Sequence, residues 1–137
     1  MTCSVALKPS PMLASLLAAL HALAAGSAWL GLSGAALLLT VAGIVLSAAW
    51  GVGDALLAWP SSIHAMELEE NGAGRWTDGR GHAHPVLGTR ASWVSAGLVV
   101  VGLRTSRWRT RWVVLLPDAA APGPLRQFRT WLRWRSS

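Results

Sequence analysis

An apolar stretch from Pro9 to Gly53 contains no Asp, Glu, Lys or Arg and consists mostly of Ala, Leu, Val, Gly and Ile. A helix rises about 1.5 Å per residue, so about 20 apolar residues cross the roughly 30 Å of hydrocarbon in a bilayer. The stretch is therefore long enough for two transmembrane helices.

The turn between these helices is expected at Gly31–Gly34, because two glycines within four residues weaken a helix and permit a tight turn. We predict a transmembrane hairpin over residues 12–59, with helices at 12–30 and 35–57. Tryptophan is enriched where hydrocarbon meets headgroups. Three tryptophans fall near the predicted helix ends: Trp29, Trp50 and Trp59.

Two other interpretations of the apolar stretch remain open. Buried helices of a soluble protein usually keep one polar face toward water, and neither segment has such a face. A cleaved signal peptide is the closer rival, because Lys8 precedes the apolar run and the small residues Ala24, Ala25 and Gly26 imitate a cleavage site.

Positive charge is concentrated after the hairpin. The formal net charge is +6, and all eleven arginines lie between Arg75 and Arg135. Segments rich in Lys and Arg beside transmembrane helices stay in the cytoplasm. We therefore expect both termini on that side, with residues 1–11 as a cytoplasmic tail. Cys3 is the only cysteine, which excludes an internal disulfide and fits a reducing compartment.

The pattern changes after Pro60 and is typical of a small antiparallel β domain over residues 60–137. Met66 and Leu68 alternate with glutamates, as in a half-buried strand. Glycine-rich turns follow at 71–74 and 78–81. The expected strands begin at Ile63 and continue at 75–77, 85–91, 93–104 and 107–116.

A last helix is expected over residues 124–134, with Pro124 at its first position. Its apolar side chains share one face: Leu125, Phe128, Trp131 and Leu132. Three arginines gather on the opposite side: Arg126, Arg129 and Arg133. The expected fold is thus a two-helix transmembrane hairpin followed by a small antiparallel β cytoplasmic domain with a C-terminal amphipathic helix.

The sharpest basic patch combines arginines with aromatic side chains: Arg104, Arg107, Arg109 and Arg111, with Trp108 and Trp112. On a strand, Arg107, Arg109 and Arg111 would face one way and the tryptophans the other. Anionic lipid headgroups are the favoured partner, since each basic side chain near a membrane contributes about 1 kcal/mol. An acidic protein surface comes second. Nucleic acid, bound by phosphate contact and base stacking, comes third.

Few residues suggest chemistry. Glu67 and Glu69 share a strand face, where a solvated role is the simple account. His82 and His84 lie together with His64 elsewhere, but zinc sites space their ligands more widely and usually include Cys. There is no phosphate-binding glycine motif. We therefore expect no enzyme activity, no cofactor and no metal site.

His21 is the one ionisable side chain within the first helix. Such a residue is by default a functional hypothesis. The simpler role is packing, in which a hydroxyl of the neighbouring helix satisfies the imidazole. Candidate hydroxyls belong to Ser27, Ser33, Thr40 and Ser47.

Several segments together resemble the YgfX family, also called the CptA toxin family. They are Leu20-His21-Ala22 in the hairpin, Gly74-Arg75-Trp76 after a short strand and turn, and Ser92-Trp93-Val94 before a Val-rich strand ending at Leu103-Arg104. The closing block fits best: Val114-Leu115-Leu116-Pro117-Asp118, then Phe128-Arg129-Thr130-Trp131-Leu132-Arg133.

The resemblance implies a bacterial inner-membrane protein that is the toxin half of a type IV toxin–antitoxin pair. It further implies cytoplasmic links to the cytoskeletal proteins FtsZ and MreB. The antitoxin would be a small soluble protein also known as a flavinylation factor for succinate dehydrogenase.

The functional expectation is a membrane-anchored protein-interaction module that acts as a toxin-like regulator of cytoskeletal and cell-division polymers. The alternative is a structural or assembly subunit of an inner-membrane complex. Such a subunit would copurify stoichiometrically, and its overexpression would not arrest growth.

The anchor and the cleaved signal peptide predict different mature proteins. If the first apolar segment is a retained helix, intact-mass spectrometry of the mature protein gives the full 14.5 kDa chain. Loss of the residues up to Gly26 would establish the signal peptide instead.

Overall fold

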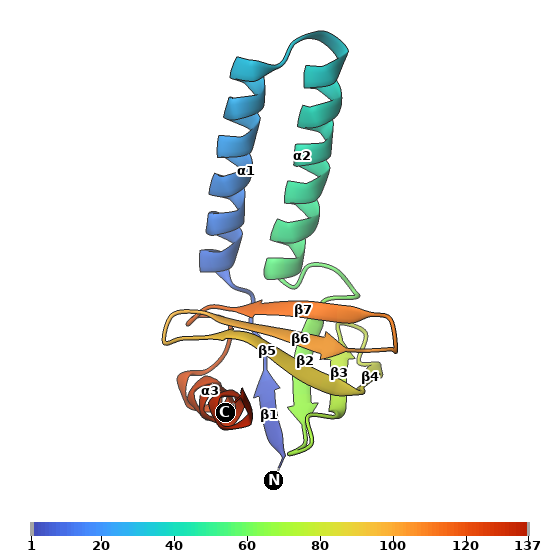
Figure 1. Ribbon diagram of the computed structural model, residues 1–137, viewed down its shortest axis with the longest axis vertical. Coiled ribbons are helices and arrows are strands. Elements are labelled where there is room, and N and C mark those ends of the chain that lie inside the picture. Colours follow the sequence, from blue (N-terminus) through green and yellow to red (C-terminus); the bar gives the residue numbers. More distant parts are fainter. Residues whose placement is uncertain (1, 137) are drawn as a thin grey trace.

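The computed structural model describes residues 2–136 and has a helical hairpin standing on a β-rich domain (Figure 1). Helix α1 spans Pro11–Gly31 and helix α2 spans Gly34–Ala55. Ser10 caps α1 by accepting a hydrogen bond from the Leu13 N–H. Gly34 opens α2 at φ +61°, a conformation that glycine adopts without strain. The two predicted apolar helices are confirmed, with ends shifted by one or two residues.

Both helices are long and apolar enough to cross a membrane. Only 11% of the most apolar window of α1 and none of that of α2 is buried. Figure 1 shows the two helices packed against each other and extending beyond the sheets. This exposure is opposite to that of helices buried in a soluble core.

The N-terminal segment corrects the prediction of a tail over residues 1–11. Cys3–Ala6 form strand β1, which pairs antiparallel with β2, Ile63–Leu68. Val5 is buried in the core, and Lys8 N–H donates to the carbonyl of Ala119. The β domain is therefore built from chain on both sides of the hairpin. A four-residue strand whose partner lies far along the chain leaves no periodic signal of its own.

The strands form two antiparallel sheets. The first has the order β1-β2-β3-β4, where β3 is Gly74–Asp78 and β4 is Ala83–Val86. The second has the order β5-β6-β7. Its strands are Gly88–Val94, Val99–Arg104 and Thr110–Leu115.

Three strand predictions need correction. The single strand expected at 85–91 is divided between the two sheets on either side of Leu87. Trp93 lies in β5, which ends at Val94, instead of in the Val-rich strand, because a turn closed by Ser95 N–H and the carbonyl of Leu98 intervenes. The strand expected at 107–116 begins only at Thr110.

The core lies between the two sheets and is closed by helix α3, Pro122–Ser136. Strands of the second sheet run across those of the first (Figure 1). Alternate side chains from both sheets face inward, among them Met66, Leu68, Val101 and Leu103. Helix α3 contributes its predicted apolar face: Leu125, Phe128 and Leu132 are buried, and Trp131 packs against them.

One carboxylate joins the base of α1 to the domain. Asp118 follows β7 and accepts hydrogen bonds from the hydroxyl of Ser10 at 2.6 Å and from the N–H of Met12 at 3.0 Å. It therefore places a negative charge at the N-terminus of α1, where the helix dipole favours it. Burial opposes ionisation of Asp118, but these hydrogen bonds outweigh it and hold the pKa of the carboxyl below its ordinary value.

Replacing Asp118 tests this attachment. Asp118→Ala leaves the Met12 N–H and the Ser10 hydroxyl without their acceptor, so we expect it to lower the free energy of unfolding by about 2 kcal/mol. Thermal unfolding followed by circular dichroism in detergent measures the change. Glu67→Ala is the matched control, because it breaks only the exposed ion pair with Arg75 and should cost less than about 1 kcal/mol. Equal losses in the two variants would contradict the role given to Asp118.

Candidate functional site

A second carboxylate lies at the base of α2. Asp54 accepts a hydrogen bond from the hydroxyl of the fully buried Ser62 at 2.8 Å. Its Oδ1 lies 3.8 Å from the guanidinium of Arg111 on β7. The same guanidinium donates to the carbonyl of Ser61 at 2.8 Å. The end of α2, the linker after it and β7 are thus connected at one place.

Arg111 also begins a stacked column that runs onto the first sheet. Its guanidinium lies 4.8 Å from the ring centre of Trp76, close enough for a cation–π contact. The indole of Trp76 stacks on the imidazole of His84, with ring centres 4.2 Å apart. His84 Nε2 lies 2.9 Å from Asp78 Oδ2. The hydrogen bond with His84, reinforced by the N–H groups of His82 and Arg80, lowers the pKa of Asp78 to about 2.

The Trp50 and Trp59 indoles form a further stack at the end of α2. Their ring centres are 5.5 Å apart, and the Trp59 N–H donates to the carbonyl of Trp50. Gly53 makes this approach possible, since a Cβ there would overlap the indole of Trp59. Sequence analysis placed both tryptophans near a membrane boundary but did not identify the contact between them.

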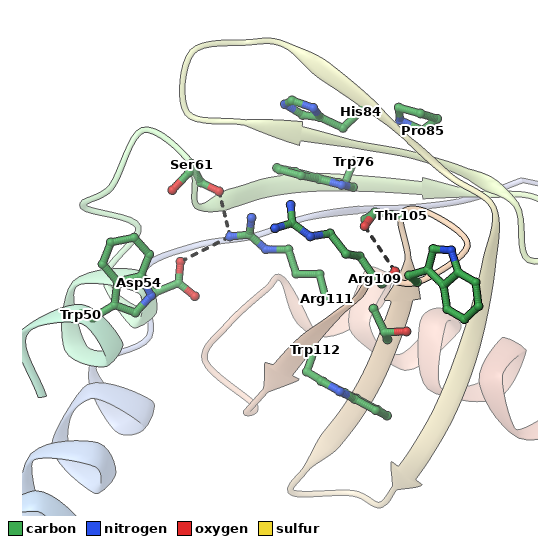
Figure 2. Close-up of a pocket in the computed structure, with 12 residues that line it drawn as sticks. Trp50, Asp54, Ser61, Trp76, His84, Pro85, Thr105, Arg109, Arg111 and Trp112 are labelled. Atoms are coloured by element: carbon green, nitrogen blue, oxygen red, sulfur yellow. Dashed lines mark hydrogen bonds and ion pairs between the residues drawn. The ribbon is translucent and has the colours of Figure 1, made fainter. Parts of the chain in front are cut away.

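These residues border an open pocket of about 750 Å³ at the junction of hairpin and domain, which we call the junction pocket. Figure 2 shows Arg109 and Arg111 projecting toward Trp76, with Trp50 and Asp54 of α2 beside them. The pocket follows β7, an edge strand of the second sheet. Its aromatic and charged lining consists of Trp50, Trp76, Trp108, Trp112, His84, Asp54, Arg109 and Arg111.

Two polar groups at this pocket lack a partner. The buried Trp76 Nε1 has no hydrogen-bond acceptor among the described residues. The exposed guanidinium of Arg109 also makes no hydrogen bond or ion pair with any residue that the structure describes. Asp54 offsets the charge of Arg111, so Arg109 supplies the surplus positive charge of the lining.

The predicted basic patch is only partly a strand face. Arg104 ends β6, whereas Arg107 and Arg109 lie in the turn to β7, which is closed by Thr105 N–H and the carbonyl of Arg109. The turn prevents the three arginines from sharing one strand face, so that prediction is wrong. Arg111 alone of the three lies on β7, on the same face as the buried Val113 and Leu115. Arg107 stacks over Trp108, whose side chain is 88% exposed.

The arginines of α3 line a different surface. Arg126 is exposed and borders a groove of about 650 Å³ between α3 and β1, which we call the α3 groove. Arg133 is also exposed, whereas Arg129 is half-buried and its Nε has no partner among the described residues. Figure 1 places α3 on the side of the domain away from the hairpin, so the α3 groove and the junction pocket are separate.

His21 makes the interhelical contact expected of a packing residue. Its Nε2 lies 3.1 Å from the hydroxyl of Ser47 on α2, and its Nδ1 lies 2.6 Å from the carbonyl of Leu17. Both ring nitrogens therefore have partners within the hairpin.

Across residues 2–136 no three side chains of His, Cys, Asp or Glu gather in a metal-binding group. Glu67 pairs with Arg75 on the neighbouring strand at 2.6 Å. The arrangement is suited to binding, because its distinctive groups are cations and aromatic rings.

Comparisons of the chain with protein-family models, curated proteins and solved structures gave no match. The resemblance to the YgfX family therefore stays a prediction from the sequence.

The low pKa of Asp78 predicts how stability depends on pH. Because folding lowers this pKa from 3.8 to about 2, the carboxylate stabilises the folded chain at pH values above 3.8. That contribution is lost as the pH falls through about 2. Asp78→Asn retains an oxygen for the turn N–H groups but has no charge to titrate. We expect a shallower fall in its unfolding temperature between pH 5 and pH 2 than in the wild type. Identical pH profiles would contradict the assignment.

Proposed function

We propose that this chain is a membrane-anchored protein-interaction module. The hairpin supplies an apolar anchor, and Asp54 and Asp118 hold the β domain against its base. Arginines outnumber carboxylates after the hairpin, which supports an orientation with the domain and both termini in the cytoplasm of a bacterial inner membrane.

The α3 groove is the proposed partner surface, and a soluble protein with an acidic face is its proposed occupant. Arg126 gives this groove its positive charge, and Trp134 lines the same groove with 81% of its surface exposed. Aromatic and arginine side chains dominate the energy of many protein interfaces. The position of α3 away from the hairpin leaves the groove accessible to a soluble partner (Figure 1). This placement is the observation that carries the proposal.

Cys3 fits a structural role in the same groove. The thiol is half-buried, and burial raises its pKa, so it stays protonated and poorly nucleophilic near neutral pH. Binding by shape and charge is therefore favoured over thiol chemistry.

In the form that the YgfX resemblance implies, the partner is the small soluble antitoxin or one of the polymers FtsZ and MreB. Toxicity would then follow from obstructed polymer assembly. An assembly subunit of an inner-membrane complex remains the second proposal. It differs by copurifying stoichiometrically with that complex and by leaving growth unaffected when overexpressed.

A charge-reversal experiment tests the partner surface. The full chain in detergent is compared with Arg126→Glu and with Arg80→Glu for retention of purified FtsZ, MreB and the candidate antitoxin. Both arginines are exposed, but Arg80 lies in the β3–β4 turn and outside the groove. We expect Arg126→Glu to weaken retention at least about tenfold, because it replaces attraction to an acidic surface by repulsion.

Arg80→Glu should retain the partner within about twofold. Equal retention by all three proteins would contradict the α3 groove as the binding surface. Far-ultraviolet circular dichroism shows whether each variant is folded.

A further inference from the structure

The junction pocket is separate from the α3 groove, and its lining suggests a ligand of a different kind from the protein partner proposed there. We propose that it binds the phosphate group of one anionic phospholipid from the leaflet nearest the β domain. This inference rests on the membrane-anchor part of the proposed function, because only an inserted hairpin brings the pocket to the headgroups.

The position of the pocket follows from the length of α2. Its 22 residues span about 33 Å, slightly more than the roughly 30 Å of hydrocarbon. When α2 crosses a bilayer, its last turns therefore emerge among the headgroups. Trp50 and Asp54 lie in those turns and form one wall of the pocket (Figure 2).

The aromatic lining suits that depth. Trp50, Trp108 and Trp112 are all largely exposed and border the same opening. Indole rings favour the boundary between hydrocarbon and headgroups, since they combine an apolar surface with one N–H donor. Three such rings around one pocket provide contact for the glycerol and upper acyl region of a lipid.

The charged lining suits a phosphate. The guanidinium of Arg111 is held in place by the Ser61 carbonyl and by Asp54, whereas the guanidinium of Arg109 has no hydrogen-bond or ion-pair partner among the described residues. Guanidinium groups bind phosphate oxygens through charge-assisted, often bidentate, hydrogen bonds. Arg109 is therefore the residue expected to contact the phosphate, and the fixed Arg111 lies beside it.

Trp76 provides an independent observation. Its side chain is 6% exposed and forms part of the pocket lining, yet its Nε1–H lacks an acceptor among the described residues. A buried donor left unsatisfied costs about 1–3 kcal/mol. An oxygen brought into the pocket by a lipid or its water shell would remove this cost.

Free phosphate esters share this chemistry, but the geometry favours the lipid. The pocket volume of about 750 Å³ exceeds what a phosphate alone fills, and its walls are aromatic. With the hairpin inserted, the bilayer also limits the approach of a large acidic protein or a nucleic acid to this level.

Native mass spectrometry of the full chain in detergent tests the proposal. The probes are phosphatidylglycerol, which carries a net negative charge, phosphatidylcholine, which is zwitterionic, and soluble glycerol phosphate. We expect one tightly bound phosphatidylglycerol per chain, weaker retention of phosphatidylcholine, and no displacement by glycerol phosphate at equal concentration.

The variants compare two arginines near the base of the hairpin. Arg109→Gln removes the expected phosphate contact and should weaken phosphatidylglycerol binding about tenfold. Arg80→Gln removes the same charge from a turn whose Gly79 contacts the linker residue Pro60, but it lies outside the pocket lining. It should change binding less than about twofold.

Equal weakening by the two variants would overturn the site in favour of general charge attraction. Displacement by glycerol phosphate would overturn the lipid as ligand, and equal binding of the two lipids would overturn recognition of the anionic headgroup. Carbonate extraction of membranes containing the same proteins tests the anchor separately. An extracted wild type would contradict the anchor, whereas a retained Arg109→Gln protein with lost lipid binding supports the site.

Discussion

Two carboxylates at the base of the hairpin hold this structure together. Asp118 binds the first turn of α1 through Ser10 and Met12, and Asp54 joins the end of α2 to Ser62 and Arg111. Each accepts at least one hydrogen bond where helix and domain meet, so the orientation of the hairpin is coupled to that of the sheets. Together with the backbone hydrogen bond from Lys8 to Ala119, these contacts fix the orientation of the hairpin relative to the β domain.

The two basic surfaces, the junction pocket and the α3 groove, lie at different distances from the hairpin. Arg109 and Arg111 lie in the junction pocket beside the end of α2, whereas Arg126 lies in the α3 groove on the other side of the domain. Arginine side chains therefore line two separate surfaces, one beside the hairpin and one away from it. Lipid phosphate suits the first because tryptophans surround it at the base of the anchor. A soluble acidic partner suits the second because nothing in the described chain covers it.

Local patterns predicted the parts of the fold that have strong periodicity. The charge-free run gave both helices of the hairpin, and the spacing of Leu125, Phe128 and Leu132 gave α3 and its buried face. Local patterns could not predict the pairing of strands that lie far apart in the sequence. Strand β1 pairs with Ala65–Leu68, some sixty residues away. For the junction pocket, the sequence predicted only a patch of arginines and tryptophans and none of their contacts. The column of Arg111, Trp76 and His84 joins separate strands, and no spacing along the chain encodes that contact.

The central claim is that the hairpin crosses a membrane with its turn on one side and the β domain on the other. Labelling of single cysteines by an impermeant thiol reagent tests it directly, in a chain whose Cys3 is replaced by serine. One variant carries Ser33→Cys in the hairpin turn and another Gly97→Cys in the exposed β5–β6 turn. The account predicts labelling of the Ser33→Cys protein in intact cells and of the Gly97→Cys protein only after lysis. Labelling of both positions in intact cells, or of Gly97→Cys alone, would contradict it.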